Sequence, residues 1–232
     1  MRRRGASGGE TPGQGRFITF EGIEGTGKST QISLLASRLR TAGIEPVVTR
    51  EPGGTELGRR LRSLLLAADT PPMGSLAELL LYATDRAQHL EELVRPALEQ
   101  GRLVLCDRYL DATLAYQGYG RELGVERIRR LHREPPLDLV PQRTILLDLE
   151  AEKALERARE RNRDEGLETA EGRFEAEPLA FHERVRAGYL ELAAADPGRV
   201  RVVPASGDPS TVARRVAAEL VDMFPILAGG NG

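Results

Sequence analysis

The chain of 232 residues has little of several features that would point to particular classes of protein. Its one cysteine, Cys106, excludes a disulfide framework and a cysteine-based zinc site, and makes a reducing, cytoplasmic location the default expectation. No apolar run approaches the roughly 20 residues that cross a bilayer, which argues against a membrane partner. The formal net charge of −2 provides no overall field to attract nucleic acid.

The two ends of the chain also lack structural signals. Three arginines near the start are followed by no apolar stretch. Residues 1–15 therefore do not have the pattern of a secretory signal and are expected to be a disordered tail. Residues 227–232 are expected to be a second flexible tail, which leaves a single domain over residues 16–226.

Lysine is the scarcest of the charged residues. Of the 33 basic residues, only Lys28 and Lys153 are lysines, and all the others are arginines. A lysine that stands against such a bias indicates a position that favours a compact ammonium group over a planar guanidinium.

What is present is a regular alternation of short apolar runs and longer stretches with helical periodicity. The runs predict strands at residues 16–21, 44–49, 102–106, 144–149 and 199–203. Helical patterns lie near residues 28–42, 55–67, 75–100, 123–132, 151–163, 178–195 and 208–224. This alternation predicts a doubly wound α/β fold with right-handed crossovers and a parallel sheet. The polar stretch 162–178 is longer than an ordinary connection and predicts a mobile loop with a functional role.

The strongest motif lies between the first predicted strand and the first predicted helix. Residues 22–29 read G-I-E-G-T-G-K-S and match the phosphate-binding pattern G-x-x-x-x-G-K-S, for which about 0.002 chance matches are expected at this composition. Glycines let backbone N–H groups surround an anion, and the helix N-terminus adds partial positive charge. Lys28 then reaches the β- and γ-phosphates, and the Ser29 hydroxyl binds Mg²⁺. The predicted ATP-binding residues of this loop are Gly22, Ile23, Glu24, Gly25, Thr26, Gly27, Lys28, Ser29 and Thr30.

A phosphate-binding loop by itself is shared by kinases, GTPases and motor ATPases. A GTPase would be expected to carry an N-K-x-D guanine-binding motif, but the only other lysine, Lys153, follows Glu152. The residues that would bind a phosphoryl acceptor are therefore needed to distinguish a kinase from a motor ATPase.

Five segments, one of which contains this loop, resemble bacterial thymidylate kinases of the nucleoside-monophosphate kinase family. They are FITFEGIEGTGKST (17–30), TREPGGT (49–55), YATDRAQHLEELVRPAL (82–98), LCDRYLDATLAYQGYGR (105–121) and FHERVRAGYLELA (181–193). The resemblance implies a P-loop kinase fold with five parallel strands flanked by helices and a short mobile lid at about residues 160–178. It also implies a homodimer that transfers the γ-phosphoryl group of ATP to dTMP with Mg²⁺, in dTTP biosynthesis.

Several residues of these segments are predicted to surround the acceptor phosphate. Arg108 follows the third strand at its carboxyl end, where open α/β sheets bind ligands, and its planar guanidinium suits a phosphate group. Asp107 ends an apolar strand and is expected to hold a magnesium-bound water. The resemblance implies that Arg62 is a second phosphate ligand and that Glu51 lies near both magnesium and the acceptor phosphate. From the residues alone, a solvated helix position for Arg62 is an equal alternative.

The resemblance also assigns a nucleoside site. Tyr82 and Arg86 are four residues apart on a predicted helix and therefore share one face. The family places the aromatic ring under thymine and the guanidinium on its O4 atom. Further matches are Thr113 and Gln117 at the base edge, Tyr116 beside C2′ of the sugar, and Glu24 near the 3′-hydroxyl.

The cation that stabilises the transferred phosphoryl group has no candidate inside the phosphate-binding loop, whose interior holds no basic residue. The chain thus resembles the class of the family whose lid supplies this cation. The candidates are Arg157, Arg159, Arg161, Arg163 and Arg173. Arg161 and Arg163, at the expected junction of helix and loop, are predicted to be catalytic, and Arg173 is predicted to contact ATP. The alternative is a solvated helix, because acidic residues alternate with these arginines.

Other notable residues predict structural roles. His89, His132 and His182 lack the spacing of metal ligands and are expected to be partly exposed helix residues. Leucine triplets at residues 64–66 and 79–81 exceed one helix face and predict core packing together with an apolar dimer surface.

Two other functions remain open from the sequence. One is a kinase for another monophosphate such as dUMP or UMP, although Tyr116 opposes a ribonucleotide. The other is a nucleotide-binding switch or scaffold with poor turnover, and the presence of the acceptor-site residues argues against it.

Overall fold

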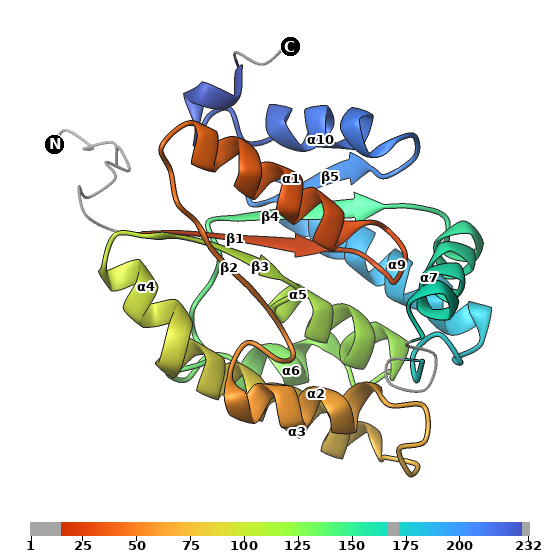
Figure 1. Cartoon of the computed structure of the whole chain (residues 1–232). Helices are drawn as coiled ribbons and strands as arrows, with labels where there is room; N and C mark the ends of the chain where they lie inside the picture. The colour runs from red at the N-terminus through yellow and green to blue at the C-terminus, as the bar shows by residue number, and fades with distance from the viewer. Residues whose placement is uncertain (1–14, 167–171, 229–232) are drawn as a thin grey trace, which may run out of the picture.

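The computed structural model of the chain describes residues 15–166 and 172–228 (Figure 1). Within these ranges, parallel strands form one five-stranded sheet in the order β2-β3-β1-β4-β5. The strands are β1 (Arg16–Glu21), β2 (Val47–Arg50), β3 (Leu103–Asp107), β4 (Arg143–Asp148) and β5 (Val200–Pro204). The predicted α/β fold with five parallel strands is confirmed, and the carboxyl ends of the strands lie at one edge of the sheet.

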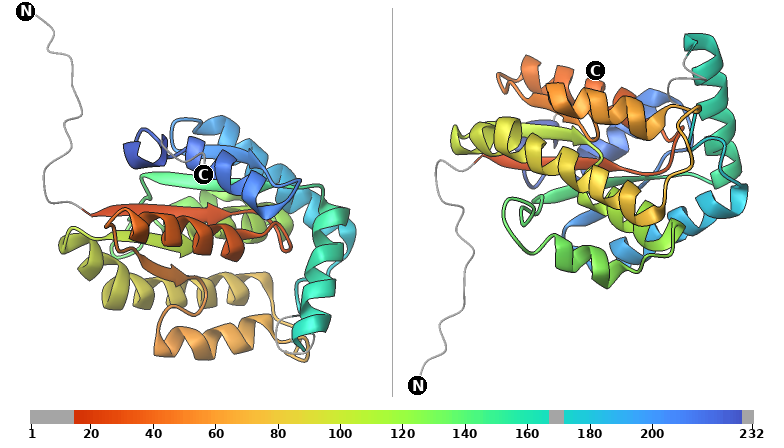
Figure 2. Two further views of the ribbon diagram at one scale, coloured as in Figure 1. Left: turned by 45° about the horizontal axis from the view of Figure 1, so that its top comes forward. Right: turned by 90° about the horizontal axis from the view of Figure 1, so that it is seen from below.

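Helices cover both faces of this sheet. α1 (Lys28–Thr41) and α10 (Pro209–Ala218) pack against each other on one face, whereas α9 (Leu179–Ala195) lies on the other (Figures 1 and 2). α7 (Ala151–Glu165) stands beyond the carboxyl ends of the strands. No described helix is both long enough and apolar enough to span a membrane.

The remaining helices lie along the β2–β3 side of the molecule. α2 (Glu56–Leu66) packs against α3 (Ser75–His89), which continues through the π-helical turn η1 (Leu90–Val94) into α4 (Arg95–Glu99). The elements after β3 are α5 (Leu110–Thr113), the π-helical segment η2 (Leu114–Gly120) and α6 (Val125–Leu131). A short 3₁₀ turn, η3 (Pro225–Ala228), follows α10.

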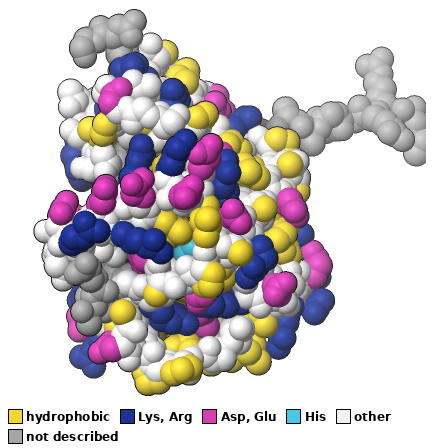
Figure 3. Space-filling model, turned by 90° about the vertical axis from the view of Figure 1, so that its right-hand side faces the viewer, with side chains coloured by type: hydrophobic (Ala, Val, Ile, Leu, Met, Phe, Trp, Pro, Cys, Tyr) yellow, Lys and Arg dark blue, Asp and Glu magenta, His cyan; other side chains and the backbone are white. Residues whose placement is uncertain are grey.

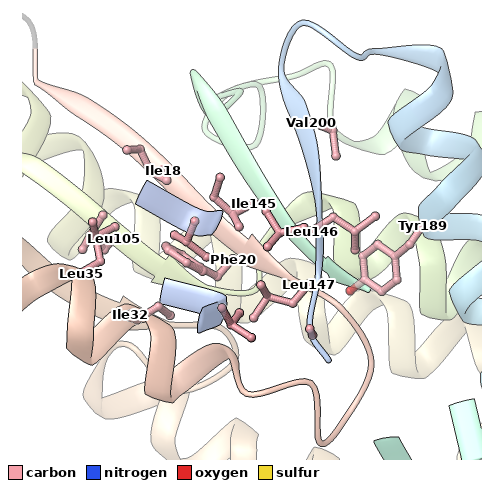
Figure 4. Close-up of a cluster of buried hydrophobic side chains, with 14 of the residues drawn as sticks. Ile18, Phe20, Ile32, Leu35, Leu105, Ile145, Leu146, Leu147, Tyr189 and Val200 are labelled. Atoms are coloured by element: carbon pink, nitrogen blue, oxygen red, sulfur yellow. The ribbon is translucent and has the colours of Figure 1, made fainter. Parts of the chain in front are cut away.

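The main core lies between the central strands and the helices on both faces (Figure 4). Phe20 of β1 and Ile145 of β4 are fully buried and pack with Ile32 of α1. Tyr189 of α9 belongs to the same cluster. Because both faces are covered, β1 and β4 are buried over almost their whole length, as expected for the interior of a parallel sheet.

One helical region is not predicted by the sequence pattern. Residues 110–120 form α5 and η2, although Gly118 and Gly120 lower the local helix propensity. Gly120 lies so close to α9 that a Cβ atom there would be 2.7 Å from the ring of Phe181. Tertiary packing against α9 thus overrides local propensity in this region.

The boundaries of two other helices differ from those predicted. The single helix expected over residues 75–100 has a π-helical turn in its middle. The helix that begins at Ala151 continues to Glu165 and ends on Gly166, which has a left-handed backbone conformation. Arg163 therefore lies within α7 and not at the junction with a loop.

Candidate active site

The phosphate-binding loop connects β1 directly to α1. Gly25 and Gly27 have φ angles of 76° and 88°, which glycine adopts without strain. A Cβ atom on Gly25 would lie 1.9 Å from the backbone oxygen of Ala154, so the approach of α7 also requires glycine. The loop predicted from the sequence is thus present between the predicted strand and helix.

Lys28 is held inside this loop. Its Nζ atom donates to the backbone oxygens of Gly22 and Ile23, each at 3.0 Å. Burial, followed by the positive charge of Arg108, lowers the pKa of Lys28 to about 8. An arriving anion would restore the charge balance around the ammonium group, so the loop is prepared to bind phosphate.

One cleft runs from this loop to α3 and η2. Its lining includes Lys28, Ser29 and Thr30 at one end and Arg62, Tyr82, Arg86, Thr113 and Gln117 at the other. Glu24, Glu51, Asp107, Arg108 and Tyr116 also line it. Figure 3 views the molecule from the side toward which the strands of Figure 1 point, where basic and acidic side chains surround a smaller number of hydrophobic ones. The structure thus brings most of the predicted site residues into one cleft.

Glu24 is the centre of a buried cluster beside the loop. Its carboxylate accepts from Arg108 at 2.8 Å and from the Tyr116 hydroxyl at 2.7 Å. Burial alone would raise the pKa of Glu24, but Arg108, His182 and Lys28 outweigh it and hold the pKa well below its usual range. The carboxylate therefore remains ionised and can accept hydrogen bonds from Tyr116, Arg108 and a ligand hydroxyl.

Arg108 has a backbone conformation that is unusual for a residue with a side chain. Its φ angle is 69°, directly after the end of β3. The guanidinium lies over the ring of Tyr116, with 4.8 Å between its carbon and the ring centroid, and donates to the hydroxyl of Tyr189 at 3.3 Å. The cation is thereby aimed into the cleft at the carboxyl edge of the sheet, as the sequence predicts.

Arg86 is the centre of a second buried cluster at the far end of the cleft. Its Nε atom donates to Glu51 at 2.8 Å, and one terminal nitrogen donates to the hydroxyl of Thr113 at 2.9 Å. The other oxygen of Glu51 accepts from Nδ1 of His89 at 2.8 Å. Both oxygens of Glu51 therefore have a partner, and one of these partners is Arg86.

The predicted stacking residue Tyr82 and the predicted base-edge residue Gln117 have different surroundings. Tyr82 is half-buried in α3 and lines the cleft. Gln117 donates to the buried carboxylate of Glu78 at 2.8 Å. Glu78 also accepts from Arg121 and forms an ion pair with Arg173.

The predicted lid arginines separate into two groups. Arg157 and Arg161 line the cleft, and Arg161 is 44% exposed with its nearest partner in the adjacent Asn162, at 2.7 Å. Arg159, Arg163 and Arg173 do not line the cleft. Arg173 is instead fixed to the end of α2, where it donates to the backbone oxygen of Leu65 at 2.8 Å.

The three histidines are buried, contrary to the sequence-based expectation of partly exposed residues. His89 and His182 are fully buried, and His132 is 6% exposed. Each makes a hydrogen bond with a residue that lines the cleft. His89 bonds to the carboxylate of Glu51, His182 to the backbone oxygen of Phe174, and His132 to the guanidinium of Arg86. Sequence spacing does not reveal these contacts, because each partner is at least eight residues away along the chain.

The residues available for a divalent cation are oxygen donors beside the loop. The hydroxyl of Ser29 donates to Asp107 at 2.8 Å, so one hydroxyl and one carboxylate adjoin at the end of β3. Within the described residues, no three His, Cys, Asp or Glu side chains gather around one point. A pair of oxygen ligands with further positions filled by water and phosphate suits Mg²⁺, which seldom uses an all-protein site.

A parallel α/β sheet with a phosphate-binding loop and an arginine-rich pocket in one cleft defines a P-loop phosphotransferase. The sequence matches the family model described as thymidylate kinase over residues 20–216. The chain belongs to the thymidylate kinase family, and the predicted family is confirmed.

Individual relatives agree over nearly their whole length. A thymidylate kinase from Desulfovibrio desulfuricans is 56% identical over 196 residues, which cover 84% of this chain and 90% of the relative. One from Solidesulfovibrio magneticus is 51% identical over 200 residues, which cover 86% of this chain and 96% of the relative. The crystal structure of thymidylate kinase from Ehrlichia chaffeensis has a TM-score of 0.71 and 32% sequence identity, and the match covers 89% of this chain and 99% of that one.

Proposed function

We propose that the protein transfers the γ-phosphoryl group of ATP to dTMP, with Mg²⁺, and releases dTDP and ADP. As a member of the thymidylate kinase family it is a phosphotransferase that uses dTMP as acceptor and ATP as donor. The observation that carries the assignment of roles is that Lys28 of the phosphate-binding loop and Arg86 of α3 line the same cleft. A phosphate-binding ammonium and a fixed, donor-only guanidinium suit a donor triphosphate and the carbonyl edge of a pyrimidine, respectively.

At the donor end, the backbone N–H groups of the loop and Lys28 would bind the β- and γ-phosphates of ATP. Ser29 and Asp107 would hold Mg²⁺, Asp107 through a water molecule, and the bound ion would offset charge on the β- and γ-phosphate oxygens. Glu51 was also predicted to lie near the metal, but its two oxygens are bound by Arg86 and His89. We therefore propose that Glu51 acts on the acceptor side by fixing Arg86.

At the acceptor end, Arg108 and Arg62 would bind the phosphate of dTMP. Arg108 reaches the cleft from the end of β3, and Arg62 reaches it from α2, where it also donates to the backbone oxygen of Pro52 at 3.1 Å. Two cations on one phosphate orient its oxygen toward the donor and lower the repulsion between the two phosphates.

The nucleoside would lie between Tyr82 and the segment Thr113–Gln117. The ring of Tyr82 offers a stacking surface, and Arg86 offers hydrogen-bond donors to O4 of the base. Tyr116, fixed by its bond to Glu24, would lie beside C2′ of the sugar and exclude a 2′-hydroxyl. Glu24 would accept the 3′-hydroxyl.

The transferred phosphoryl group would receive its last cation from α7. Arg161 already lines the cleft, whereas Arg163 would have to move toward it together with the helix. We propose a lid over about residues 160–178 that closes on the bound nucleotides and brings these arginines to the reacting phosphate; residues 167–171 of this lid lie outside the described ranges.

A homodimer is proposed from exposed leucines on two neighbouring helices. Leu57 and Leu64 of α2 and Leu76 and Leu80 of α3 are between 41% and 49% exposed. Their spacings of seven and four residues place each pair on one helix face. Leu64→Arg combined with Leu80→Arg should yield a monomer in sedimentation, whereas Leu34→Arg on α1, where Leu34 is 41% exposed, should leave the dimer intact.

The activity is tested with a coupled assay that contains ATP, Mg²⁺ and one of several monophosphates. We expect kcat/KM to be largest for dTMP, smaller for dUMP, and at least about tenfold smaller for dCMP and UMP. A larger kcat/KM for any ribonucleotide or for dCMP would contradict the proposed acceptor site. We also propose a cytoplasmic location, as the single buried cysteine suggests a reducing environment.

A further inference from the structure

A histidine that lies outside the cleft contacts Arg86. His132 follows α6, is 6% exposed, and does not line the cleft. Its Nε2 atom lies 2.8 Å from a terminal nitrogen of Arg86, and its Nδ1 atom lies 2.9 Å from the backbone oxygen of Ile128. The imidazole thus bridges α6 to α3.

These two contacts determine the protonation state of the imidazole. A backbone oxygen only accepts hydrogen bonds, so Nδ1 of His132 carries a hydrogen. A guanidinium only donates, so Nε2 presents its lone pair to Arg86. Only the neutral Nδ1–H tautomer satisfies both contacts. Burial and the positive charge of Arg86 lower the pKa of His132 to about 4, which agrees with a neutral ring at physiological pH.

The contact also completes the support of Arg86. A guanidinium has five N–H groups, and Glu51, His132 and Thr113 each engage one on a different nitrogen. The group also lies over the ring of Tyr109, with 4.9 Å from its carbon to the centroid. One N–H group on each terminal nitrogen is therefore left for a ligand. The three other hydrogen bonds fix the orientation of the guanidinium and so the directions of these two N–H groups.

We propose that His132 is a positioning residue for base selection, which acts by accepting a hydrogen bond from Arg86 and so fixing the two N–H groups that face the base. This proposal rests on the proposed role of Arg86 at the base edge. Fixed donors match a carbonyl oxygen at position 4 of a pyrimidine. An amino group at that position presents hydrogen atoms where an acceptor is needed, so it is rejected.

The first test compares two substitutions of similar size at the same position. His132→Leu removes the acceptor, whereas His132→Gln retains an acceptor oxygen near the position of Nε2. Loss of a hydrogen bond to a charged group predicts that His132→Leu raises KM for dTMP about tenfold, with kcat within about threefold of the wild type. It should also reduce the ratio of kcat/KM between dTMP and dCMP, because a mobile guanidinium excludes an amino group less strictly. His132→Gln should restore most of both values.

The second test does not depend on the folding of a variant. The ¹⁵N chemical shifts of His132 in the full-length wild-type protein should report the neutral Nδ1–H tautomer at pH 7. Observation of the Nε2–H tautomer or of a charged ring would overturn the proposal. Equal losses in the Leu and Gln variants would also overturn it, because they would indicate a packing role only.

A parallel variant separates this inference from the proposed role of Arg86. Arg86→Lys should lower the ratio of kcat/KM between dTMP and dCMP more than His132→Leu does, because lysine cannot retain all the contacts of the guanidinium. If Arg86→Lys keeps the ratio, base reading by Arg86 is wrong and the inference fails with it. If Arg86→Lys lowers the ratio and His132→Leu leaves both the ratio and KM unchanged, only the inference about His132 fails.

Discussion

The arginines at the two ends of the cleft are held in opposite ways. Arg86 is 1% exposed and is bound by three side chains from three different parts of the chain. Arg161 is 44% exposed, and among the described residues its polar partners are its neighbour Asn162 and, at 3.8 Å, Glu175. Arg86 is thus pre-organised before any ligand arrives, whereas Arg161 is free to change its partners. With the roles proposed above for these two arginines, base recognition would use a rigid pocket and phosphoryl transfer a movable one.

The largest effect is expected at the phosphate-binding loop. Lys28→Arg should lower kcat by about 10²–10³, because the guanidinium is too broad for the position between Gly22 and Ile23 and cannot act as a point charge. The measurement is steady-state kinetics with dTMP and ATP. Lys153→Arg is the matched control, since Lys153 is exposed on α7 and pairs only with Glu150, and it should retain wild-type kinetics. Near-normal turnover of Lys28→Arg would show that a point charge is not required.

The next largest effect sharpens the contrast between the rigid and the movable end. Arg161→Ala and Arg163→Ala should each lower kcat by tenfold or more with little change in KM for dTMP, because their contacts form mainly in the closed state. Arg214→Ala, an exposed position on α10, serves as the control. If both lid variants keep kcat within about threefold of the wild type, the cation comes from another residue and the movable end has a different role.

A smaller effect is expected at the rigid end. Tyr116→Ala should reduce the preference for dTMP over its ribonucleotide counterpart by about tenfold, because the ring that opposes a 2′-hydroxyl is removed. Tyr116→Phe retains the ring and loses only the bond to Glu24, so it should keep the preference. The measurement is the ratio of kcat/KM for dTMP to that for its ribonucleotide counterpart in each variant. An unchanged ratio in the Ala variant would show that another residue excludes the 2′-hydroxyl.

A last effect is on stability and not on catalysis, and it concerns the buried carboxyl group of Glu21 at the end of β1. Burial, together with the charge of Asp111, raises the pKa of Glu21 to about 8. A carboxyl whose pKa is higher in the folded than in the unfolded state stabilises the fold at low pH, and this contribution is lost as the pH rises through the interval from 4.5 to 8. Between pH 4.5 and pH 7 the change is about 3 kcal/mol by linkage. Urea unfolding of Glu21→Gln should show a smaller decrease of the free energy of unfolding over this interval than the wild type, and equal slopes would contradict the assigned shift.

The sequence predicts well those elements whose conformation depends on residues close together in the chain. The phosphate-binding loop needs left-handed glycines at fixed positions, and Gly25 and Gly27 have them. The central strands contain short apolar runs that are buried because helices cover both faces of the sheet. The predicted boundaries agree with the structure within one or two residues for β1, β3 and β4.

The parts that the sequence does not predict depend on contacts between distant segments. The helical segment 110–120 is stabilised by packing against α9, and Gly120 is required there by the ring of Phe181 and not by the local backbone. The burial of His132 likewise depends on Arg86, 46 residues away. Periodicity within a window cannot report either contact.

The support of Arg86 has a consequence for how the specificity of this enzyme can evolve. A single substitution at Arg86 that changed the preferred base would also leave Glu51, which has a side chain 3% exposed, without its arginine partner, and His132 without its donor. A buried polar group without its partner lowers the free energy of unfolding. The first substitution toward a new base would therefore lower stability before it improves base selection. A change of base preference therefore requires coordinated substitutions in three separate segments, and natural variation should alter these positions together.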